Sequence, residues 1–174
     1  MKTLVIAPHP DDEILGVGGT LLKRKSQGHS LAWVIVTKPS NILGWNDIQK
    51  ENRDKQICLI KNQIGFDKLY QLDFPAAKLH QTELPSLVNS ISKIIKEFAP
   101  EEIFFPHIGD VHTDHEIVHK AIISSTKSFR NHFLKRLIVY ETLSETEFGL
   151  DKTKAFFPNL YIDISRFLDQ KIKL

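Results

Sequence analysis

Histidines and carboxylates gather in two short segments of this sequence. One segment contains His107, His112, His115 and His119 within thirteen residues, where an even spread of the 8 histidines along the chain would place fewer than one. The other segment, residues 8–13, reads Pro-His-Pro-Asp-Asp-Glu. Imidazole and carboxylate groups without thiolates suit Zn²⁺, with Fe²⁺, Co²⁺ and Mn²⁺ as alternatives. The residue types therefore indicate a divalent metal site that takes ligands from both segments.

Each polar segment directly follows a short apolar run that is typical of a buried strand. These runs are residues 3–7 and residues 102–105. In an open α/β sheet, ligands bind at the edge where the strands have their carboxyl ends. A buried strand that ends in a cluster of ionisable side chains is costly unless they face a cation or a polar crevice. We therefore expect the two segments to meet at one edge of a sheet.

The rest of the chain alternates between apolar runs and amphipathic stretches. Further strands are predicted at residues 31–36, 68–72 and 137–140, with another extended piece at 159–164, and helices at 14–27, 47–64, 83–98 and from about 114. Strands buried on both faces and joined by crossover helices indicate an α/β protein. The expected architecture is a Rossmann-like three-layer fold with a mostly parallel sheet. A length of 174 residues fits one domain, covering 1–174.

Composition and charge exclude several classes of function. The chain is 41% hydrophobic and 25% charged, as in folded globular proteins. Its 23 basic residues are spread along the chain against 21 acidic ones, which disfavours nucleic acid and anionic membranes as partners. No apolar run approaches the roughly 20 residues of a membrane span, and the first is too short for a signal peptide. We expect a cytoplasmic protein with a small-molecule partner, and a homo-oligomer remains open.

The single cysteine is expected to be structural. Cys58 lies in the sequence Gln-Ile-Cys-Leu-Ile over residues 56–60, which favours a buried thiol over a nucleophile. One cysteine cannot form an internal disulfide, so a reducing compartment is expected.

The two polar segments resemble the signatures of the PIG-L/LmbE-like family of zinc-dependent de-N-acetylases. Residues 7–13 read Ala-Pro-His-Pro-Asp-Asp-Glu, and residues 107–115 read His-Ile-Gly-Asp-Val-His-Thr-Asp-His. The resemblance is specific because both motifs occur in order, about a hundred residues apart, each after a predicted strand. It extends loosely to Asp163 and takes in Arg53 and the pair at residues 140–141.

The resemblance implies a set of metal ligands and a catalytic base. His9, Asp12 and His115 are the expected zinc ligands, and Asp11 is the expected general base. Neighbouring carboxylates project differently from a tight turn, so one can bind metal while the other accepts a proton from the metal-activated water.

Three further residues are expected to assist. His112 would stabilise the oxyanion or protonate the departing amine, since it lies three positions before His115. Asp114 would fix the tautomer of an imidazole. Arg53 would bind a polar group of the substrate, as its position in the family suggests.

Several of these residues have structural alternatives. Asp12 and Asp114 could simply cap the helices that follow them, and Arg53 could lie on a solvated helix face. Glu13 fits a helix-dipole residue and a buried pocket acid equally well. Trp45 could stack on a sugar ring or pack beside the start of a helix.

Most of the other histidines are expected to have structural roles. His119, four residues after His115, is expected to support the site or the core and not to bind metal. His107 could line the site or stabilise a turn. His29, His80 and His132 stand alone in the sequence and are expected at the surface.

The expected function is that of a zinc-dependent hydrolase that removes the acetyl group from an N-acetylated amino sugar or glycoconjugate. This is hydrolysis of a linear amide C–N bond, of the N-acetylglucosaminyl deacetylase type. The alternatives are another metal-dependent amidase or esterase, and a non-catalytic sugar- or nucleotide-binding domain. Relatives continue for several dozen residues past the point that corresponds to residues 169–174, so part of a C-terminal wall is expected to be missing. The loop at residues 37–41 also lacks the Thr-x-Gly pattern of the family.

Overall fold

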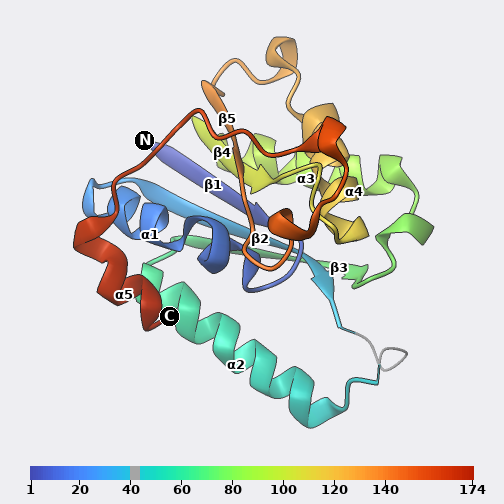
Figure 1. The fold of residues 1–174 in the computed structure, drawn as a ribbon, viewed down its shortest axis with the longest axis horizontal. Helices are drawn as coiled ribbons and strands as arrows, with labels where there is room; N and C mark the ends of the chain where they lie inside the picture. The colour runs from blue at the N-terminus through green and yellow to red at the C-terminus, as the bar shows by residue number, and fades with distance from the viewer. Residues whose placement is uncertain (40–43) are drawn as a thin grey trace.

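The computed structural model describes residues 1–39 and 44–174. Within these ranges, five parallel strands form one sheet in the order β3-β2-β1-β4-β5 (Figure 1). The strands are β1 (Lys2–Ala7), β2 (Ser30–Lys38), β3 (Lys68–Pro75), β4 (Glu102–Pro106) and β5 (Arg136–Tyr140). The chain runs outward from β1 to β3 and then returns to β4, so the strand order reverses between β1 and β4. The predicted α/β fold of Rossmann-like type is confirmed, with a wholly parallel sheet.

Helices cover both faces of this sheet and make three layers (Figure 1). The α-helices are α1 (Asp12–Ser26), α2 (Asp47–Ile64), α3 (Leu84–Phe98), α4 (Thr113–Ser125) and α5 (Leu168–Ile172). Short 3-10 helices are η2 (Leu79–Gln81), η3 (Ser128–Arg130), η4 (Thr146–Phe148), η5 (Lys152–Lys154) and η6 (Ser165–Phe167).

Side chains alternate in direction along each strand, and this divides the hydrophobic core between the two faces of the sheet. On β1, Leu4 and Ile6 pack with residues of α3 and α4, whereas Val5 and Ala7 pack with residues of α1 and α2. Successive side chains of a strand point to opposite faces, so each apolar strand supplies both cores. The central strands are consequently buried throughout, and only their ends reach solvent.

Small residues allow α1 to approach the structure around it. A β-carbon at Gly16 would meet the ring of Tyr140, and one at Gly19 would meet the side chain of Ile164. Residues 159–164, predicted as an extended piece, form no strand; they cross α1, where Lys23 Nζ donates to the carbonyl of Asp163 at 2.8 Å. Ile164 packs against α1 at Gly19, so the strand-like pattern does not lead to a sheet position.

The prediction that Cys58 is buried is wrong, because its side chain is exposed. The buried residues of α2 are Arg53, Ile57 and Ile64. Cys58 follows Ile57 directly and therefore lies about 100° around the helix from it. The side chains of residues 56–60 point in several directions around α2, and only one side of this helix is buried.

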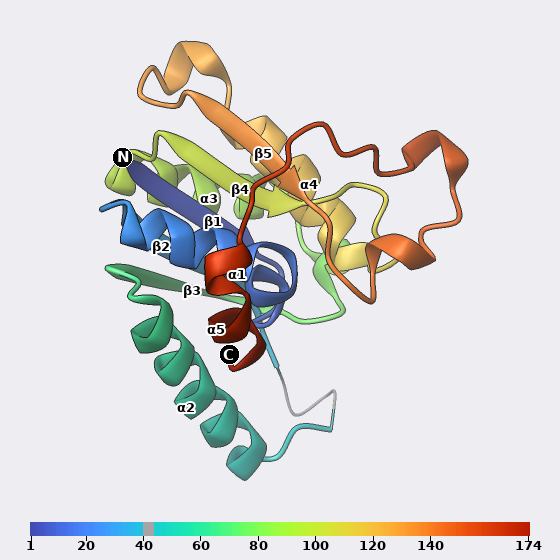
Figure 2. The ribbon, with the colours of Figure 1, turned by 60° about the vertical axis from the view of Figure 1, so that its left-hand side comes forward.

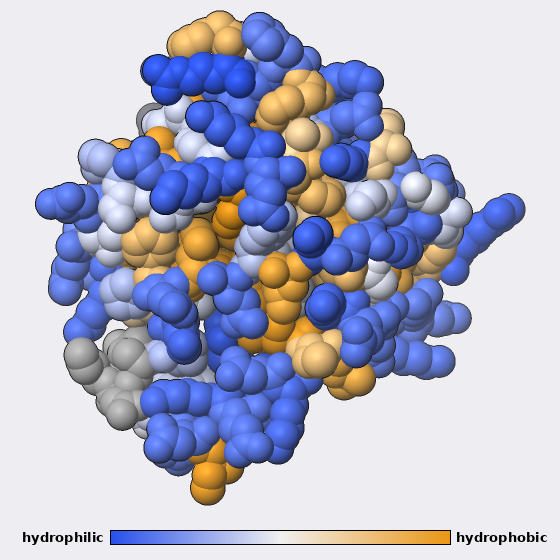
Figure 3. Space-filling view, turned by 180° about the vertical axis from the view of Figure 1, so that it is seen from behind, coloured by the Kyte–Doolittle hydropathy of each residue, from blue (hydrophilic) through white to orange (hydrophobic). Residues whose placement is uncertain are grey.

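The surface is mostly hydrophilic, with hydrophobic side chains gathered near the middle of the face opposite to that of Figure 1 (Figure 3). Among residues 1–39 and 44–174, no helix is both long enough and apolar enough to cross a bilayer.

Candidate metal centre

The two polar segments lie side by side because the strands before them are neighbours. β1 and β4 pair in parallel, with Val5 opposite Phe104. The turn after β1 carries His9 and leads into α1, while the loop after β4 leads into α4. The segment after β5 reaches over the same edge of the sheet (Figure 2). The predicted meeting of the two segments is therefore present in the fold, at the point where the strand order reverses.

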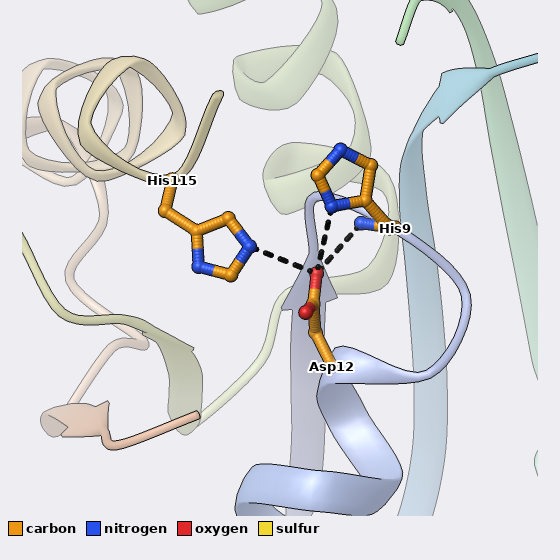
Figure 4. A group of neighbouring side chains, drawn as sticks. All are labelled: His9, Asp12 and His115. Carbon is orange, nitrogen blue, oxygen red and sulfur yellow. Dashed lines mark hydrogen bonds and ion pairs between the residues drawn. The ribbon is translucent and has the colours of Figure 1, made fainter. Parts of the chain in front are cut away.

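Two imidazoles, those of His9 and His115, converge on one carboxylate oxygen of Asp12 (Figure 4). His9 Nδ1 lies 3.5 Å from Asp12 Oδ2, and His115 Nε2 lies 3.3 Å from the same oxygen. The backbone N–H of His9 donates to this oxygen at 2.8 Å and holds the turn in place. The ligand atoms of the three residues lie within 4.8 Å of one another, which is close enough for a single metal ion.

The outer nitrogen of each imidazole is held by a second carboxylate. His9 Nε2 lies 3.1 Å from Asp114 Oδ2, and His115 Nδ1 lies 2.8 Å from Asp110 Oδ2. A carboxylate accepts a hydrogen bond from the nitrogen that it faces, so the proton stays there and the opposite nitrogen is free to bind metal. Both inner nitrogens are thus directed at Asp12.

Asp114 is held in place by more than His9. Its carboxylate accepts hydrogen bonds from the backbone N–H groups of Ala77, at 2.7 Å, and Leu79, at 3.2 Å. It does not cap α4, since the N-cap position is His112. The geometry therefore matches a residue that orients an imidazole, and that imidazole is His9.

Asp110 is a site residue to which sequence reasoning gave no role. Its side chain is fully buried. Besides facing His115, it accepts a hydrogen bond from Thr146 Oγ1 at 2.6 Å through its other oxygen. Its position five residues before His115, within the second motif, was the signal that could have found it. The partner Thr146 comes from η4, which sequence spacing does not bring near the motif.

The histidines and carboxylates of the cluster strongly shift one another's pKa values. Burial lowers the pKa of His9, but its interactions with Asp114 and Asp12 outweigh this effect and raise that pKa to about 9. Burial also lowers the pKa of His115, and the contacts with Asp110 and Asp12 reverse the effect and raise that pKa to about 10. Burial would raise the pKa of Asp12, yet the two histidines hold it well below its usual range. Positive charge is therefore stabilised at this position.

One atom indicates that the cluster is built for a ligand. His115 Nε2 is buried and has no hydrogen-bond partner among the described residues, in spite of its proximity to Asp12. A buried polar atom without a partner is rare and calls for an explanation such as an ion. Two imidazole nitrogens and a carboxylate form a typical three-ligand set for a divalent metal that keeps one position for water.

Asp11 lies beside this cluster, at the start of α1. It occupies the N-cap position of α1 but makes no side-chain capping hydrogen bond. Partial burial and the charge of Asp12 raise its pKa. The carboxylate is thus available for a proton from a group at the metal centre.

Glu13, the next acid of the motif, is a buried pocket acid and not a solvated helix-dipole residue. It is 1% exposed, and burial raises its pKa well above the usual value.

The ring of His112 packs against the cluster, and a hydrogen bond fixes its tautomer. Its ring centroid lies 4.5 Å from that of His9 and 5.6 Å from that of His115. Its Nδ1 accepts a hydrogen bond from the backbone N–H of Asp114 at 3.1 Å. The proton of neutral His112 is therefore on Nε2. Burial and the charge of His9 lower the pKa of the ring, which favours this neutral form.

A pocket of about 490 Å³ opens next to the His-Asp-His cluster. We call it the outer pocket; its lining includes His9, Asp11, Trp45, Asn52 and Arg53. Arg53 is 7% exposed and does not lie on a solvated helix face. Its guanidinium donates to the carbonyl of Thr37 at 2.9 Å, and burial lowers its pKa. Trp45 is 37% exposed at the rim.

The loop after β2 is only partly described. Of the loop at residues 37–41, which lacks the Thr-x-Gly pattern, Ser40 and Asn41 lie outside the described residues.

The remaining histidines do not point their free nitrogens at Asp12. His107 Nε2 lies 2.7 Å from the carbonyl of Lys154, and His119 Nδ1 lies 2.9 Å from that of Pro106, so both stabilise the loops and core around β4. His80 and His132 are exposed, as predicted. His29 is half-buried: its side chain is 10% exposed and its Nδ1 lies 2.9 Å from Thr3 Oγ1.

Fold and site together define a Rossmann-like α/β protein with a His-Asp-His cluster at the carboxyl edge of its sheet. The model of the PIG-L family, described as GlcNAc-PI de-N-acetylase, matches residues 4–126. The chain belongs to this family, whose members depend on a metal. The match includes the His-Asp-His cluster and both motifs.

Individual relatives carry the names of deacetylases. The chain is 28% identical over 129 residues to a probable N-acetyl-alpha-D-glucosaminyl L-malate deacetylase 2 of Bacillus cereus, covering 69% of this chain and 58% of the relative. It is 25% identical over 194 residues to the diacetylchitobiose deacetylase of Thermococcus kodakarensis, covering 99% of this chain and 67% of the relative. The chain thus spans little more than half of the first relative.

A similar fold occurs in the conserved protein TT1542 from Thermus thermophilus. The two structures have a TM-score of 0.78 and 26% sequence identity, over 97% of this chain and 74% of the other.

Proposed function

We propose that the protein is a zinc-dependent hydrolase that removes the acetyl group from an N-acetylated amino sugar or its conjugate. The observation that carries the proposal is that buried His115 Nε2 and His9 Nδ1 are both directed at one oxygen of Asp12. Two nitrogens and one oxygen suit zinc better than calcium or magnesium, which prefer oxygen ligands alone. His9, Asp12 and His115 would hold the ion, and Asp114 and Asp110 would orient the imidazoles.

The chemistry needs a strong nucleophile at neutral pH and a proton acceptor for it. When bound, zinc supplies Lewis acidity, which makes water acidic enough to lose a proton near pH 7. Asp11 would accept this proton; its carboxylate caps no helix, and it lines the same pocket as His9. Its raised pKa brings it closer to that of the water it would deprotonate, as general base catalysis requires.

His112 is assigned to the developing oxyanion. The hydrogen bond from the N–H of Asp114 occupies its Nδ1, so Nε2–H can donate to negative charge on the acetamide oxygen. The lowered pKa disfavours the imidazolium that protonation of the amine would need. Of the two roles open at the outset, hydrogen-bond donation is the one that this contact supports.

The outer pocket supports a polar, neutral substrate. It offers a guanidinium from Arg53, the amides of Gln49, Asn52 and Gln56, and the ring of Trp45. Amide groups both donate and accept, as sugar hydroxyls require, and an exposed indole provides an apolar face for a pyranose ring. The relatives named for N-acetyl-glucosaminyl malate and diacetylchitobiose point to the same substrate class.

Deacetylation assays on metal-depleted and zinc-restored protein test this function. N-acetylglucosamine, diacetylchitobiose and N-acetylglucosaminyl malate should release acetate only with restored metal. Asp11→Asn provides the matched control, because it retains the metal ligands. Turnover without metal would contradict the proposal and favour an amidase of another kind. Binding of an N-acetyl sugar without turnover would contradict it too, and would favour a binding domain.

A further inference from the structure

A second cavity lies between the first turn of α1 and the middle of α2. We call it the inner groove; its volume is about 360 Å³. The two helices supply a largely aliphatic lining, made up of Ile14, Leu15, Ile57, Leu59 and Ile60. The three proposed metal ligands are not part of this lining, so metal binding does not explain the groove.

The surface that a ligand would meet in the inner groove is apolar. Glu13 and Trp33 belong to the lining, but each is only 1% exposed, so they contribute almost no accessible surface. Arg53 is 7% exposed, and its guanidinium donates to the carbonyl of Thr37. Leu59, by contrast, is 56% exposed. Aliphatic surface offers water few hydrogen-bond partners, so an apolar ligand that displaces this water gains free energy.

The inner groove and the outer pocket meet at the proposed general base. Pro10, Asp11, Arg53 and Gln56 line both cavities. Asp11 is exposed, so its carboxylate is accessible from the space around them. A general base acts on the water that attacks the carbonyl carbon, and the reacting carbonyl must therefore lie close to Asp11. The two groups attached to this carbonyl consequently begin next to both cavities.

The two cavities differ in polarity in the same way as the two parts of an N-acyl amino sugar. The sugar on the nitrogen carries hydroxyl groups, which match the amides of Gln49, Asn52 and Gln56 in the outer pocket. The acyl chain on the carbonyl carbon is apolar and matches aliphatic surface. The methyl of an acetyl group is about as large as a water molecule, about 30 Å³, and fills little of a cavity of about 360 Å³. A longer chain would occupy more of the groove.

We propose that the inner groove binds the acyl chain of the substrate, and that the protein hydrolyses N-acyl amino sugars with chains longer than acetyl. This inference rests on the proposed function and extends its substrate class from acetamides to longer acyl amides. The reaction is otherwise the same: the oxygen of water bonds to the acyl carbon, the C–N bond breaks, and the nitrogen takes up a proton. The products are a free amino sugar and a longer carboxylic acid in place of acetate.

The first test is binding to the metal-free protein, which does not depend on turnover. N-acetylglucosamine and N-hexanoylglucosamine differ by four methylene groups, each of which contributes about fourfold in affinity when fully buried. NMR titration should show at least about tenfold tighter binding of the hexanoyl compound, with saturable shifts of the methyl signals of Ile57 and Ile60. Equal affinity for the two compounds, or unchanged signals of both isoleucines, would overturn the inference.

The second test compares turnover of the same two compounds by zinc-restored protein. The kcat/KM for the hexanoyl compound should exceed that for the acetyl compound by at least about tenfold. Leu59→Glu places a charge on the aliphatic wall and should reduce this ratio to near one. This variant should fold, because Leu59 is largely exposed. Ile60→Phe narrows the groove and should also reduce the ratio.

Ile48→Glu is the matched control for the charged variant. It introduces the same carboxylate on the same helix, at a residue that is 70% exposed and does not line the inner groove, so the ratio should stay high. A ratio near one in the unaltered protein, or a high ratio in both Leu59→Glu and Ile60→Phe, would show that the acyl chain does not enter the groove. Absence of turnover for both compounds would contradict the proposed function alone, because the binding titration still decides whether the chain occupies the groove.

Discussion

His115 Nε2 lies 3.3 Å from Asp12 Oδ2, although the two residues follow different strands and begin different helices. The contact exists because β1 and β4 are neighbours in the sheet. It joins the two halves of the site through a nitrogen that has no hydrogen-bond partner in the described chain. The metal centre can therefore be tested from either side of the contact.

Removal of one ligand should remove the metal. His115→Ala leaves His9 and Asp12, and two ligands seldom retain zinc. Metal analysis should find about one equivalent in the unaltered chain and very little in the variant. His119→Ala is a suitable control, because its ring bonds the carbonyl of Pro106. Unchanged metal content in His115→Ala would show that the ligands are different.

Asp11→Asn should retain metal and lose catalysis. The amide is nearly isosteric but cannot accept the proton of water, and loss of a general base typically costs about 10²- to 10⁴-fold in rate. Thermal stability should change little, because Asp11 makes no capping hydrogen bond. The measurement is kcat together with metal content. Normal turnover in this variant would show that Asp11 is not the general base, and Glu13 would be the next candidate.

Substitution of His112 should affect the chemical step. His112→Ala should lower kcat by about 10²- to 10³-fold, with metal content and substrate affinity little changed. His112→Asn separates this effect from the cap of α4, since asparagine is a good N-cap residue. Both variants should be slow, but only the alanine variant should lose stability. Parallel loss of metal and activity would instead identify His112 as a ligand.

Asp110→Asn should weaken metal binding without removing a ligand. The amide can present its N–H₂ to His115 Nδ1 and favour the wrong tautomer, and loss of such a partner typically costs about 10- to 100-fold in metal affinity. Thr146→Val removes only the hydrogen bond to Asp110 and should have a smaller effect. Competition with a chromogenic chelator measures both. Equal affinity in Asp110→Asn and the unaltered protein would exclude this role.

Metal affinity should increase with pH. In the metal-free protein the pKa values of His9 and His115 are raised to about 9 and about 10, so both rings are protonated at pH 7. Metal must displace these protons, and the apparent affinity should rise by up to about 100-fold per pH unit between pH 6 and 8. Calorimetry in buffers of different ionisation enthalpy counts the protons released. A flat profile would show that neither ring needs to be deprotonated.

The same pKa values predict how the metal-free protein responds to pH. Both pKa values lie above the ordinary value of 6.5, so protonation stabilises the folded state. This contribution is complete below pH 6.5 and is lost as pH rises through about 9 and 10. Thermal unfolding of the metal-free protein across this range measures the loss.

Local pattern in the sequence was sufficient for most elements of the fold. Alternating apolar runs and amphipathic stretches predicted each strand and the major helices to within a few residues, because burial on both faces of a parallel sheet leaves a strong signal. The pattern failed at Cys58, where burial depends on which element packs against the segment. That the chain is one domain stays a prediction.

The sequence by itself determined which side chains could bind metal, since both motifs are local and each directly follows a strand. Only the tertiary structure decided which carboxylate orients which imidazole: Asp114 faces His9, Asp110 faces His115, and η4 returns to hold Asp110 through Thr146. Residue type and spacing specify chemical capacity, whereas contacts between distant segments depend on strand order and on loops that carry no periodic signal.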